Sequence, residues 1–271
     1  MIRDRKSAIA RLIQVLEIPV EYDFWVCENL GGVDERIQCL SILEVLNQTF
    51  SPLSVVLLLR RPSSHRNGDS LVLPNLDALP MLGVSDSNFL SFSDRSELIV
   101  QREVRTLVLA ELALTGGQTI WDVEAGTGSV SIEIARLFPS SRVYAIEKSA
   151  AGTALIEQNC QRFGVRNVIS LHGNAPEILY RLPTPDRIFI GGSGDNLSKI
   201  LSFCGGNLSV SGNIVLALTT LEQVNAAVKW ASDRSWIYHL LQVQLSRSLT
   251  VGQKTRFSPL NPVTILTAKK L

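Results

Sequence analysis

The sequence has few of the residues from which metal centres and disulfide scaffolds are built. Its 271 residues include only four cysteines and three histidines. The cysteines, at positions 27, 39, 160 and 204, form no close pair with the spacing of metal ligands or redox motifs. We therefore expect no metal site, and we expect reduced thiols of the kind found in a cytoplasmic protein.

Long apolar runs and an excess of one charge are also missing. No stretch approaches the roughly 18 apolar residues that suggest a membrane span, and the N-terminal segment lacks the apolar core of a signal peptide. Lys and Arg number 26 against 25 Asp and Glu, so the formal net charge is +1. Without a basic surplus, we expect neither nucleic acid nor a membrane as a partner.

The first 60 residues predict a small α/β unit. Apolar spacing favours a helix over 6–17, and residues 23–30 are typical of a short strand. A second helix is expected over 34–50, with Asp34 as its N-cap, before a buried strand at 54–60. One βαβ unit leaves a sheet face and an edge uncovered, so we expect it to be covered by self-association, as in a homo-oligomer, or by docking on another chain. The polar stretch 61–70 is the expected linker.

Residues 71–271 alternate regularly between strand and helix patterns. Strands are expected at 119–123, 142–146, 167–171, 186–190, 213–219, 236–245 and 262–268, and helices at 102–114, 129–137, 150–163, 175–181, 196–203 and 221–232. This alternation predicts an α/β fold with a doubly wound, mostly parallel seven-stranded sheet. Residues 246–259 show no helical pattern, so we expect a loop there and an antiparallel last strand.

The stretch "WDVEAGTGSVSIEIARL" (121–137) contains the first chemical signal. Gly126 and Gly128 permit a sharp turn, and the helix that follows directs free N–H groups toward any ligand at that turn. Glu147 ends the next strand, where a carboxylate can bind both hydroxyls of a ribose. A plain structural turn with an incidental acid remains open. A dinucleotide site is less favoured, because Ser131 stands where helix packing asks for a smaller residue. The acidic and glycine spacing suits S-adenosylmethionine better.

Two further loops follow strands at the same expected sheet edge. "HGNAPEIL" (172–179) supplies Asn174 and Ala175, a side chain and a backbone amide that can hold an adenine. "IFIGGSGDNL" (188–197) contains adjacent glycines, which leave open space above the strand ends. Gly191 and Gly192 also fit an ordinary turn, but three such loops at one edge favour a ligand site.

Residues 98–268 resemble the precorrin methyltransferases of the cobalamin pathway that methylate C15 and decarboxylate an acetate side chain. The matching stretches are "REVRTLVLAEL", "WDVEAGTGSVSIEIARL", "VYAIEK", "GNAPEIL", "IFIGGSG" and "LNPVTIL". Residues 6–60, with "ENLGGVDERI" and "LSVVLLLR", resemble the C-terminal part of a tetrapyrrole methylase, the domain that methylates C5 in the C5,15 fusions. The resemblance implies a class I S-adenosylmethionine methyltransferase-like domain at 71–271, preceded by a partial tetrapyrrole-methylase domain at 1–60.

The resemblance also implies the site residues. The cofactor S-adenosylmethionine is expected at Val100, Glu124, Ala125, Gly126, Thr127, Gly128, Glu147, Asn174 and Ala175. A precorrin substrate is expected near Gly192, Ser193, Asp195, Arg247 and Arg256, although the two arginines fit solvated loop positions equally well. No residue is assigned a catalytic role, because alignment of the methyl donor with the acceptor carbon supplies most of the acceleration in such a transfer.

Several positions depart from the family pattern. Glu124 stands where the family has glycine, Val100 replaces a threonine, Asn174 replaces an aspartate and Asp195 replaces a glycine. A left-handed backbone at Glu124 costs roughly 1–3 kcal/mol, and its carboxylate repels that of the cofactor. We therefore expect weakened cofactor binding. Two competing hypotheses are a non-catalytic subunit of a fuller enzyme and a methyltransferase with another small substrate.

Overall fold

The computed structural model describes residues 22–41, 44–45, 48, 50–52, 54–60, 76–92, 99–191, 196–251 and 254–270. The chain divides into two compact units, one of residues 1–72 with 250–254 and the other of residues 73–249 with 255–271. Each unit is described by itself. The expected helix at 6–17 and the expected linker at 61–70 lie outside the described residues.

The first unit contains a three-stranded sheet of β1 (Tyr22–Glu28), β2 (Arg36–Leu40) and β3 (Ser54–Arg60). Their order is β2-β1-β3, and both pairings are antiparallel. The two expected strands are confirmed, but the expected helix over 34–50 is wrong for 36–40, which form β2. The βαβ unit is therefore wrong as well. Gly31 turns the chain at φ 79°, and β2 returns along the free edge of β1, where its backbone groups find partners.

A short helical turn does follow β2, and it begins at Ser41 instead of Asp34. The Ser41 backbone N–H donates to Glu44 Oε2 at 2.7 Å, while the Glu44 backbone N–H donates to Ser41 Oγ at 3.3 Å. This reciprocal pair is a capping box. The sequence contains the signature of this motif, Ser-x-x-Glu at 41–44. The helical turn therefore begins at Ser41, and Asp34 is not its N-cap.

The two faces of this sheet differ in exposure. Phe24, Val26 and Leu40 are buried on one face, where Val45 packs against them. On the strand positions between them, Ile37, Val55, Leu57 and Leu59 are each about half exposed, from 48% to 53%. An apolar surface of this kind is typical of an interaction site, so self-association stays a prediction for this unit.

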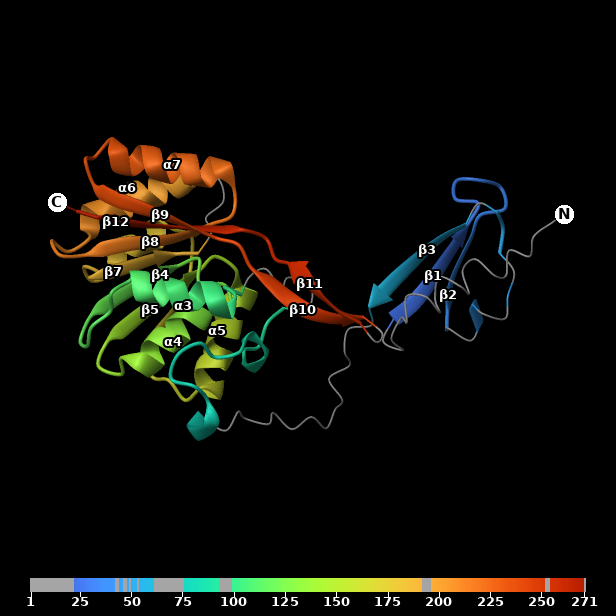
Figure 1. The fold of residues 1–271 in the computed structure, drawn as a ribbon, viewed down its shortest axis with the longest axis horizontal. Helices are drawn as coiled ribbons and strands as arrows, with labels where there is room; N and C mark the ends of the chain where they lie inside the picture. Colours follow the sequence, from blue (N-terminus) through green and yellow to red (C-terminus); the bar gives the residue numbers. More distant parts are fainter. Residues whose placement is uncertain are drawn as a thin grey trace. The chain divides into compact units, whose positions relative to one another are not determined.

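The second unit is built on a seven-stranded sheet of order β6-β5-β4-β7-β8-β12-β9 (Figure 1). Its strands are β4 (Thr119–Val123), β5 (Arg142–Glu147), β6 (Val168–His172), β7 (Arg187–Ile190), β8 (Asn213–Leu218), β9 (Ile237–Val243) and β12 (Val263–Lys269). The strands β6, β5, β4, β7 and β8 are parallel to one another. β12 lies between β8 and β9 and is antiparallel to both. All seven expected strands and the antiparallel last strand are confirmed.

The segment between β9 and β12 is a two-stranded ribbon of β10 (Ser246–Val251) and β11 (Lys254–Pro259). The expected loop over 246–259 is therefore wrong. Most side chains on the described part of β11 are exposed, so the ribbon presents no alternation of buried and exposed residues. The two strands pair with each other and not with the main sheet. Because neither strand has a buried face in its described part, the sequence shows no alternation of apolar and polar residues here.

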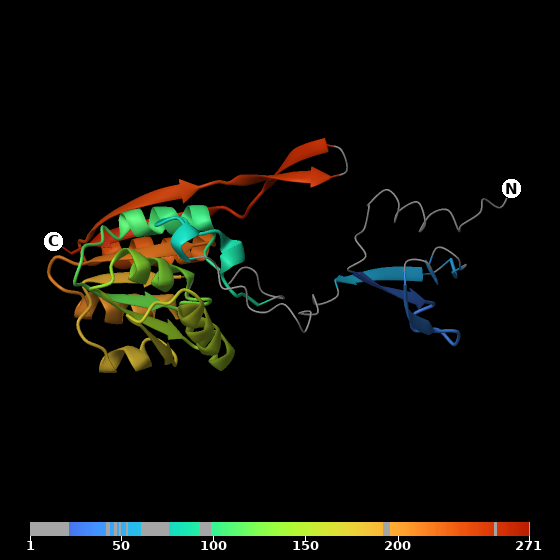
Figure 2. The same ribbon diagram turned by 90° about the horizontal axis from the view of Figure 1, so that it is seen from below.

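Helices cover both faces of the sheet (Figures 1 and 2). On one face α3 (Arg102–Glu111), α4 (Ser129–Leu137) and α5 (Ala150–Arg162) pack on Ile120, Val143 and Ala145. On the other, α6 (Leu197–Asn207) and α7 (Leu221–Ser232) pack on alternate residues such as Trp121 and Ile188. The expected helix near 175–181 is the 3-10 helix η4 (Glu177–Arg181). None of the described helices is long and apolar enough to cross a membrane.

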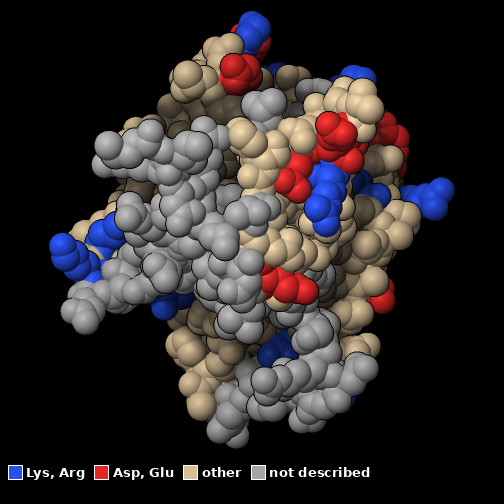
Figure 3. Space-filling model, turned by 90° about the vertical axis from the view of Figure 1, so that its right-hand side faces the viewer, with Lys and Arg blue, Asp and Glu red and all other residues tan. Residues whose placement is uncertain are grey.

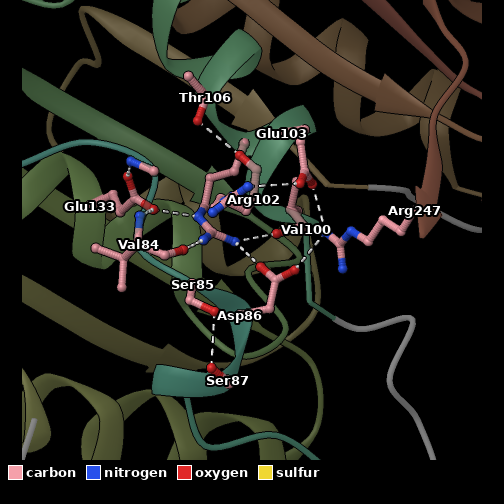
Figure 4. A network of polar contacts seen from close by, with 12 residues as sticks. Val84, Ser85, Asp86, Ser87, Val100, Arg102, Glu103, Thr106, Glu133 and Arg247 are labelled. Carbon is pink, nitrogen blue, oxygen red and sulfur yellow. Dashed lines mark hydrogen bonds and ion pairs between the residues drawn. The ribbon is translucent and has the colours of Figure 1, made fainter. Parts of the chain in front are cut away.

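A buried guanidinium joins α3, α4 and the segment that precedes them (Figure 4). Arg105 Nε donates to Glu133 Oε1 at 2.7 Å, and both side chains are completely buried. Arg105 also donates to the Val84 carbonyl at 2.5 Å, to the Val100 carbonyl, and to Asp86 Oδ1 at 3.0 Å in η2 (Asp86–Asn88). Glu133 in turn accepts from the backbone N–H groups of Gly83 and Val84. Each guanidinium nitrogen of Arg105 and each carboxylate oxygen of Glu133 thus has a hydrogen-bond partner, which is the condition for burying two charges.

We expect Glu133→Ala to destabilise the second unit by about 3–5 kcal/mol, because it leaves Arg105 buried without its counter-charge. Urea unfolding followed by tryptophan fluorescence measures this loss. The matched control is Glu103→Ala on α3, which removes an exposed partner of Arg247 and should cost less than about 1 kcal/mol. Equal losses in the two variants would show that the buried pair does not stabilise the fold.

Candidate functional site

The carboxyl ends of β4, β5 and β6 meet at one edge of the sheet, and the glycine turn follows β4 at this edge. Gly126 and Gly128 both have left-handed backbones, with φ of 58° and 75°. A Cβ on Gly128 would lie 3.1 Å from two carbons of Ile156 in α5. Gly128 is also the N-cap of α4. The turn therefore needs glycine there both for its backbone angle and for the close approach of α5.

Glu124 also has a left-handed backbone, with φ of 60°. This geometry is the one that glycine adopts freely, and it costs a glutamate about 1–3 kcal/mol of folding stability. The side chain is 18% exposed, and its Oε1 lies 4.0 Å from the Nζ of Lys148. Burial raises the pKa of Glu124, Lys148 lowers it, and the nearby Glu147 raises it further. The position therefore combines backbone strain with a partly buried negative charge.

Asp122 holds the start of α4 against β4. Its Oδ2 accepts from the Ser131 backbone N–H at 3.1 Å and from Ser131 Oγ at 2.6 Å. Ser131 thus serves as a donor, and a smaller residue would lose the hydroxyl bond. Asp122 Oδ1 has no hydrogen-bond partner among the described residues, and Thr127 Oγ1 in the turn has none either. Both atoms are buried, so each is available to a bound water or ligand.

Glu147 connects the ends of two strands. Its Oε2 accepts from the backbone N–H of Gly126 at 3.1 Å, and its Oε1 accepts from that of Ser149 at 3.0 Å. The residue is 8% exposed, and a Cβ on Gly152 would lie 2.6 Å from its Cγ. An ionised carboxylate has about four lone-pair positions, so these two bonds orient it and leave positions for the hydroxyls of a ligand.

A pocket of about 150 Å³ lies at this edge of the sheet. Its walls come from the end of β5, from the loops after β4, β5 and β6, and from the start of α6: Ile146, Glu124, Lys148, Gly173, Asn174, Ala175 and Asn196. The Asn174 side chain is exposed and has no hydrogen-bond partner among the described residues. The loops that the sequence predicted to share one edge therefore surround one cavity.

The structure brings some of the predicted site residues together. Glu124, Asn174 and Ala175 line the pocket, and Glu147 is bonded to the turn beside it. Val100 instead packs beside the hydrophobic cluster under α3. Gly192, Ser193 and Asp195 lie outside the described residues. The sequence reasoning missed Ile146, Lys148, Gly173 and Asn196, although the first three adjoin predicted residues along the chain.

The two predicted substrate arginines differ in their surroundings. Arg247 Nη2 on β10 lies 2.6 Å from Glu103 Oε2 and 3.1 Å from Asp86 Oδ2 (Figure 4). Two carboxylates therefore already neutralise its charge. Arg256 on β11 is exposed and pairs with no carboxylate among the described residues. Of the two, only Arg256 presents an uncompensated charge to an anionic ligand.

The sheet order, the antiparallel β12 and the glycine turn after β4 define a class I methyltransferase-like fold. A solved S-adenosylmethionine-dependent O-methyltransferase from Thermotoga maritima shares this fold with a TM-score of 0.55 at 15% identity, over 96% of each chain. At the level of sequence, the precorrin methyltransferase domain family matches residues 92–270. The chain belongs to this family.

Named relatives agree with that assignment. A probable cobalt-precorrin-6B C15-methyltransferase (decarboxylating) from Pyrobaculum calidifontis is 36% identical over 69% of this chain and 95% of its own length. A precorrin-6Y C5,15-methyltransferase from Sinorhizobium is 30% identical over 88% of this chain, which covers 54% of that longer protein. The solved precorrin-6Y C5,15-methyltransferase from Geobacter metallireducens superposes with a TM-score of 0.67 at 36% identity, over 71% of this chain and all of its own.

The Asp122 carboxyl generates a prediction of pH-dependent stability. Burial raises its pKa from 3.8 to about 6, against the hydrogen bonds from Ser131. Because the folded state holds the proton more tightly than the unfolded state, Asp122 lowers stability as pH rises from about 4 through about 6. In Asp122→Asn this titration is gone. The variant should therefore gain about 3 kcal/mol relative to the parent between pH 4 and pH 7.

Urea unfolding at several pH values measures that difference. The new amide group replaces an unpaired oxygen and can change the stability by an amount that does not depend on pH. Such a change shifts the plot of the stability difference against pH without altering its slope. Asp233→Asn is the control, because Asp233 is an exposed partner of Lys229 on α7 and should shift stability by less than about 1 kcal/mol at each pH. A flat difference for Asp122→Asn would contradict the prediction.

Proposed function

We propose that the chain transfers a methyl group from S-adenosylmethionine to C15 of a precorrin and assists the loss of the carboxyl group from the C12 acetate. The observation that carries this proposal is the pocket in which Glu124, Asn174 and Ala175 meet beside Glu147, in a member of the precorrin methyltransferase family. The relatives' names include cobalt-precorrin and precorrin forms, so both are candidate substrates. Self-association and a cytoplasmic location are proposed with it.

The pocket fits the nucleoside end of this cofactor. Glu147 is oriented by two backbone N–H groups and has lone pairs left for the ribose hydroxyls. The Asn174 side chain is unpaired among the described residues and can accept from an adenine amino group, while the Ala175 backbone borders the same cavity. The buried Thr127 Oγ1, which no described residue bonds, is a further partner within the turn. Only Glu124 opposes the fit, at the end that faces the methionine part.

Bound S-adenosylmethionine supplies an electrophilic methyl group. The protein residues hold the nucleoside in one orientation and keep water from the reacting atoms, which are the contributions that methyl transfer requires. No side chain needs to form a covalent bond. The strained Glu124 favours a second candidate, a subunit with impaired cofactor binding that supports a fuller enzyme. Measuring cofactor affinity distinguishes the two.

We expect Glu124→Gly to tighten S-adenosylmethionine binding about tenfold, because it removes a carboxylate from the pocket, and tenfold corresponds to about 1.4 kcal/mol. The variant should also gain about 1 kcal/mol in folding stability from relief of the left-handed backbone. Isothermal titration calorimetry and urea unfolding measure the two effects. Tight binding by the parent with no gain in the variant would contradict the weakened site.

The distribution of charged side chains also affects binding of the proposed polyanionic substrate. Figure 3 shows basic and acidic side chains interspersed among the described residues on the face that it draws. The formal net charge of the chain is only +1, so attraction for a tetrapyrrole polycarboxylate must come from individual cations near its site. Arg256 is exposed, and no described carboxylate pairs with it, while Arg247 is held by Asp86 and Glu103.

We expect Arg256→Ala to weaken binding of a soluble tetrapyrrole polycarboxylate about fivefold at low salt, since one ionic contact at a partly shielded site contributes about 1 kcal/mol. Arg247→Ala should have a smaller effect, because its charge is already compensated. Fluorescence titration measures both, with Lys229→Ala on α7 as a control for net charge. If Arg256→Ala behaves like that control, the substrate binds elsewhere.

A further inference from the structure

Two carboxylates and one cation lie in or beside the pocket. Glu124 lines it, Glu147 adjoins it, and Lys148 is the cation. The Lys148 side chain is 60% exposed, and its Nζ is 4.0 Å from Glu124 Oε1. Water therefore screens Lys148 more than it screens Glu124, whose side chain is 18% exposed. The local field at the Glu124 end of the pocket is negative.

The strand order determines which part of a ligand meets this field. Asn174 follows β6, Glu147 ends β5 and Glu124 follows β4, and these three strands are successive neighbours in the sheet. Neighbouring strands lie about 4.8 Å apart. A nucleoside with its base at Asn174 and its ribose at Glu147 therefore extends its 5′ substituent toward Glu124. That direction rests on the function proposed above.

We infer that Glu124 makes this pocket select adenine nucleosides whose 5′ substituent carries no carboxylate, and that it favours a cationic aminopropyl tail over an amino-acid tail. The amino-acid tail of the methyl donor and of its demethylated product brings a carboxylate toward Glu124. An aminopropyl tail retains the ammonium group and lacks that carboxylate. Glu124 thus attracts the ammonium group that both tails carry, and it repels the carboxylate that only the amino-acid tail carries.

The size of the preference follows from two like charges at a partly exposed site. Carboxylates about 6 Å apart in such surroundings change affinity by about tenfold, which corresponds to about 1.4 kcal/mol. Lys148 lowers this preference, because it partly neutralises Glu124. Removing Lys148 should therefore strengthen the selection, and removing the Glu124 charge should abolish it.

The test is a thermodynamic cycle of two ligands and two protein forms. The ligands differ by one carboxylate, and the proteins differ by the charge at position 124. S-adenosylhomocysteine and its decarboxylated analogue differ only in the ligand carboxylate. Calorimetry at pH 8 and low salt compares their binding to the full parent chain and to Glu124→Gln. Glutamine has the size of glutamate and requires the same left-handed backbone at position 124, so this variant removes only the negative charge. The parent should bind the decarboxylated ligand about tenfold more tightly, and the variant less than about twofold more tightly.

Two further variants serve as controls. Lys148→Gln should increase the preference for the decarboxylated ligand, whereas Asn174→Ala should weaken both ligands by the same factor and leave the preference unchanged. An equal preference in the parent and in Glu124→Gln would overturn the inference and leave the proposed function intact. If neither nucleoside binds the parent or Glu124→Gln, the inference and the proposed cofactor site both fail.

Discussion

The ion pair between Arg105 and Glu133 is the contact on which the arrangement of the second unit depends. Both side chains are completely buried, and together they bond the segment at 83–86, the carbonyl before α3 and the middle of α4. A buried pair is stable only when every donor and acceptor finds a partner. The pair therefore requires these elements to occupy one relative position, which holds α4 where its first turn meets the glycine loop.

The first turn of α4 is held by Asp122, so two buried carboxylates fix the position of this helix. Asp122 binds Ser131 in the first turn, and Glu133 lies on the next turn facing Arg105. Glu147 then holds the glycine turn itself through Gly126. Three acidic side chains thus order the edge of the sheet at which the pocket lies. Glu124 is the fourth acid at this edge, and apart from Lys148 it has no polar partner among the described residues. Its carboxylate is therefore the one that a ligand must accommodate.

In the first unit, strand pairing overrides the helix that the local sequence pattern predicts. Residues 34–50 have apolar positions at helical spacing, yet 36–40 form β2 because the edge of β1 offers backbone partners. Local propensity is a weak preference that such pairing overrides. The outcome also explains the exposed apolar residues of β2 and β3, Ile37, Val55, Leu57 and Leu59. A three-stranded sheet has two faces, and Val45 packs on one of them.

The amino-acid sequence by itself determined the seven strands of the main sheet, the glycine turn and the loops that surround the pocket. Buried parallel strands are continuous apolar runs, and a left-handed turn asks for glycine, so both are written in local residue order. Only the tertiary structure decided what depends on contacts between distant residues. The insertion of β12 between β8 and β9, the pairing of the ribbon, and the β2 edge strand are backbone pairings with little side-chain pattern. Arg247 is neutralised by Asp86 and Glu103, which lie 161 and 144 positions away from it in the sequence. Such partners are chosen by distance in space, which residue order does not contain.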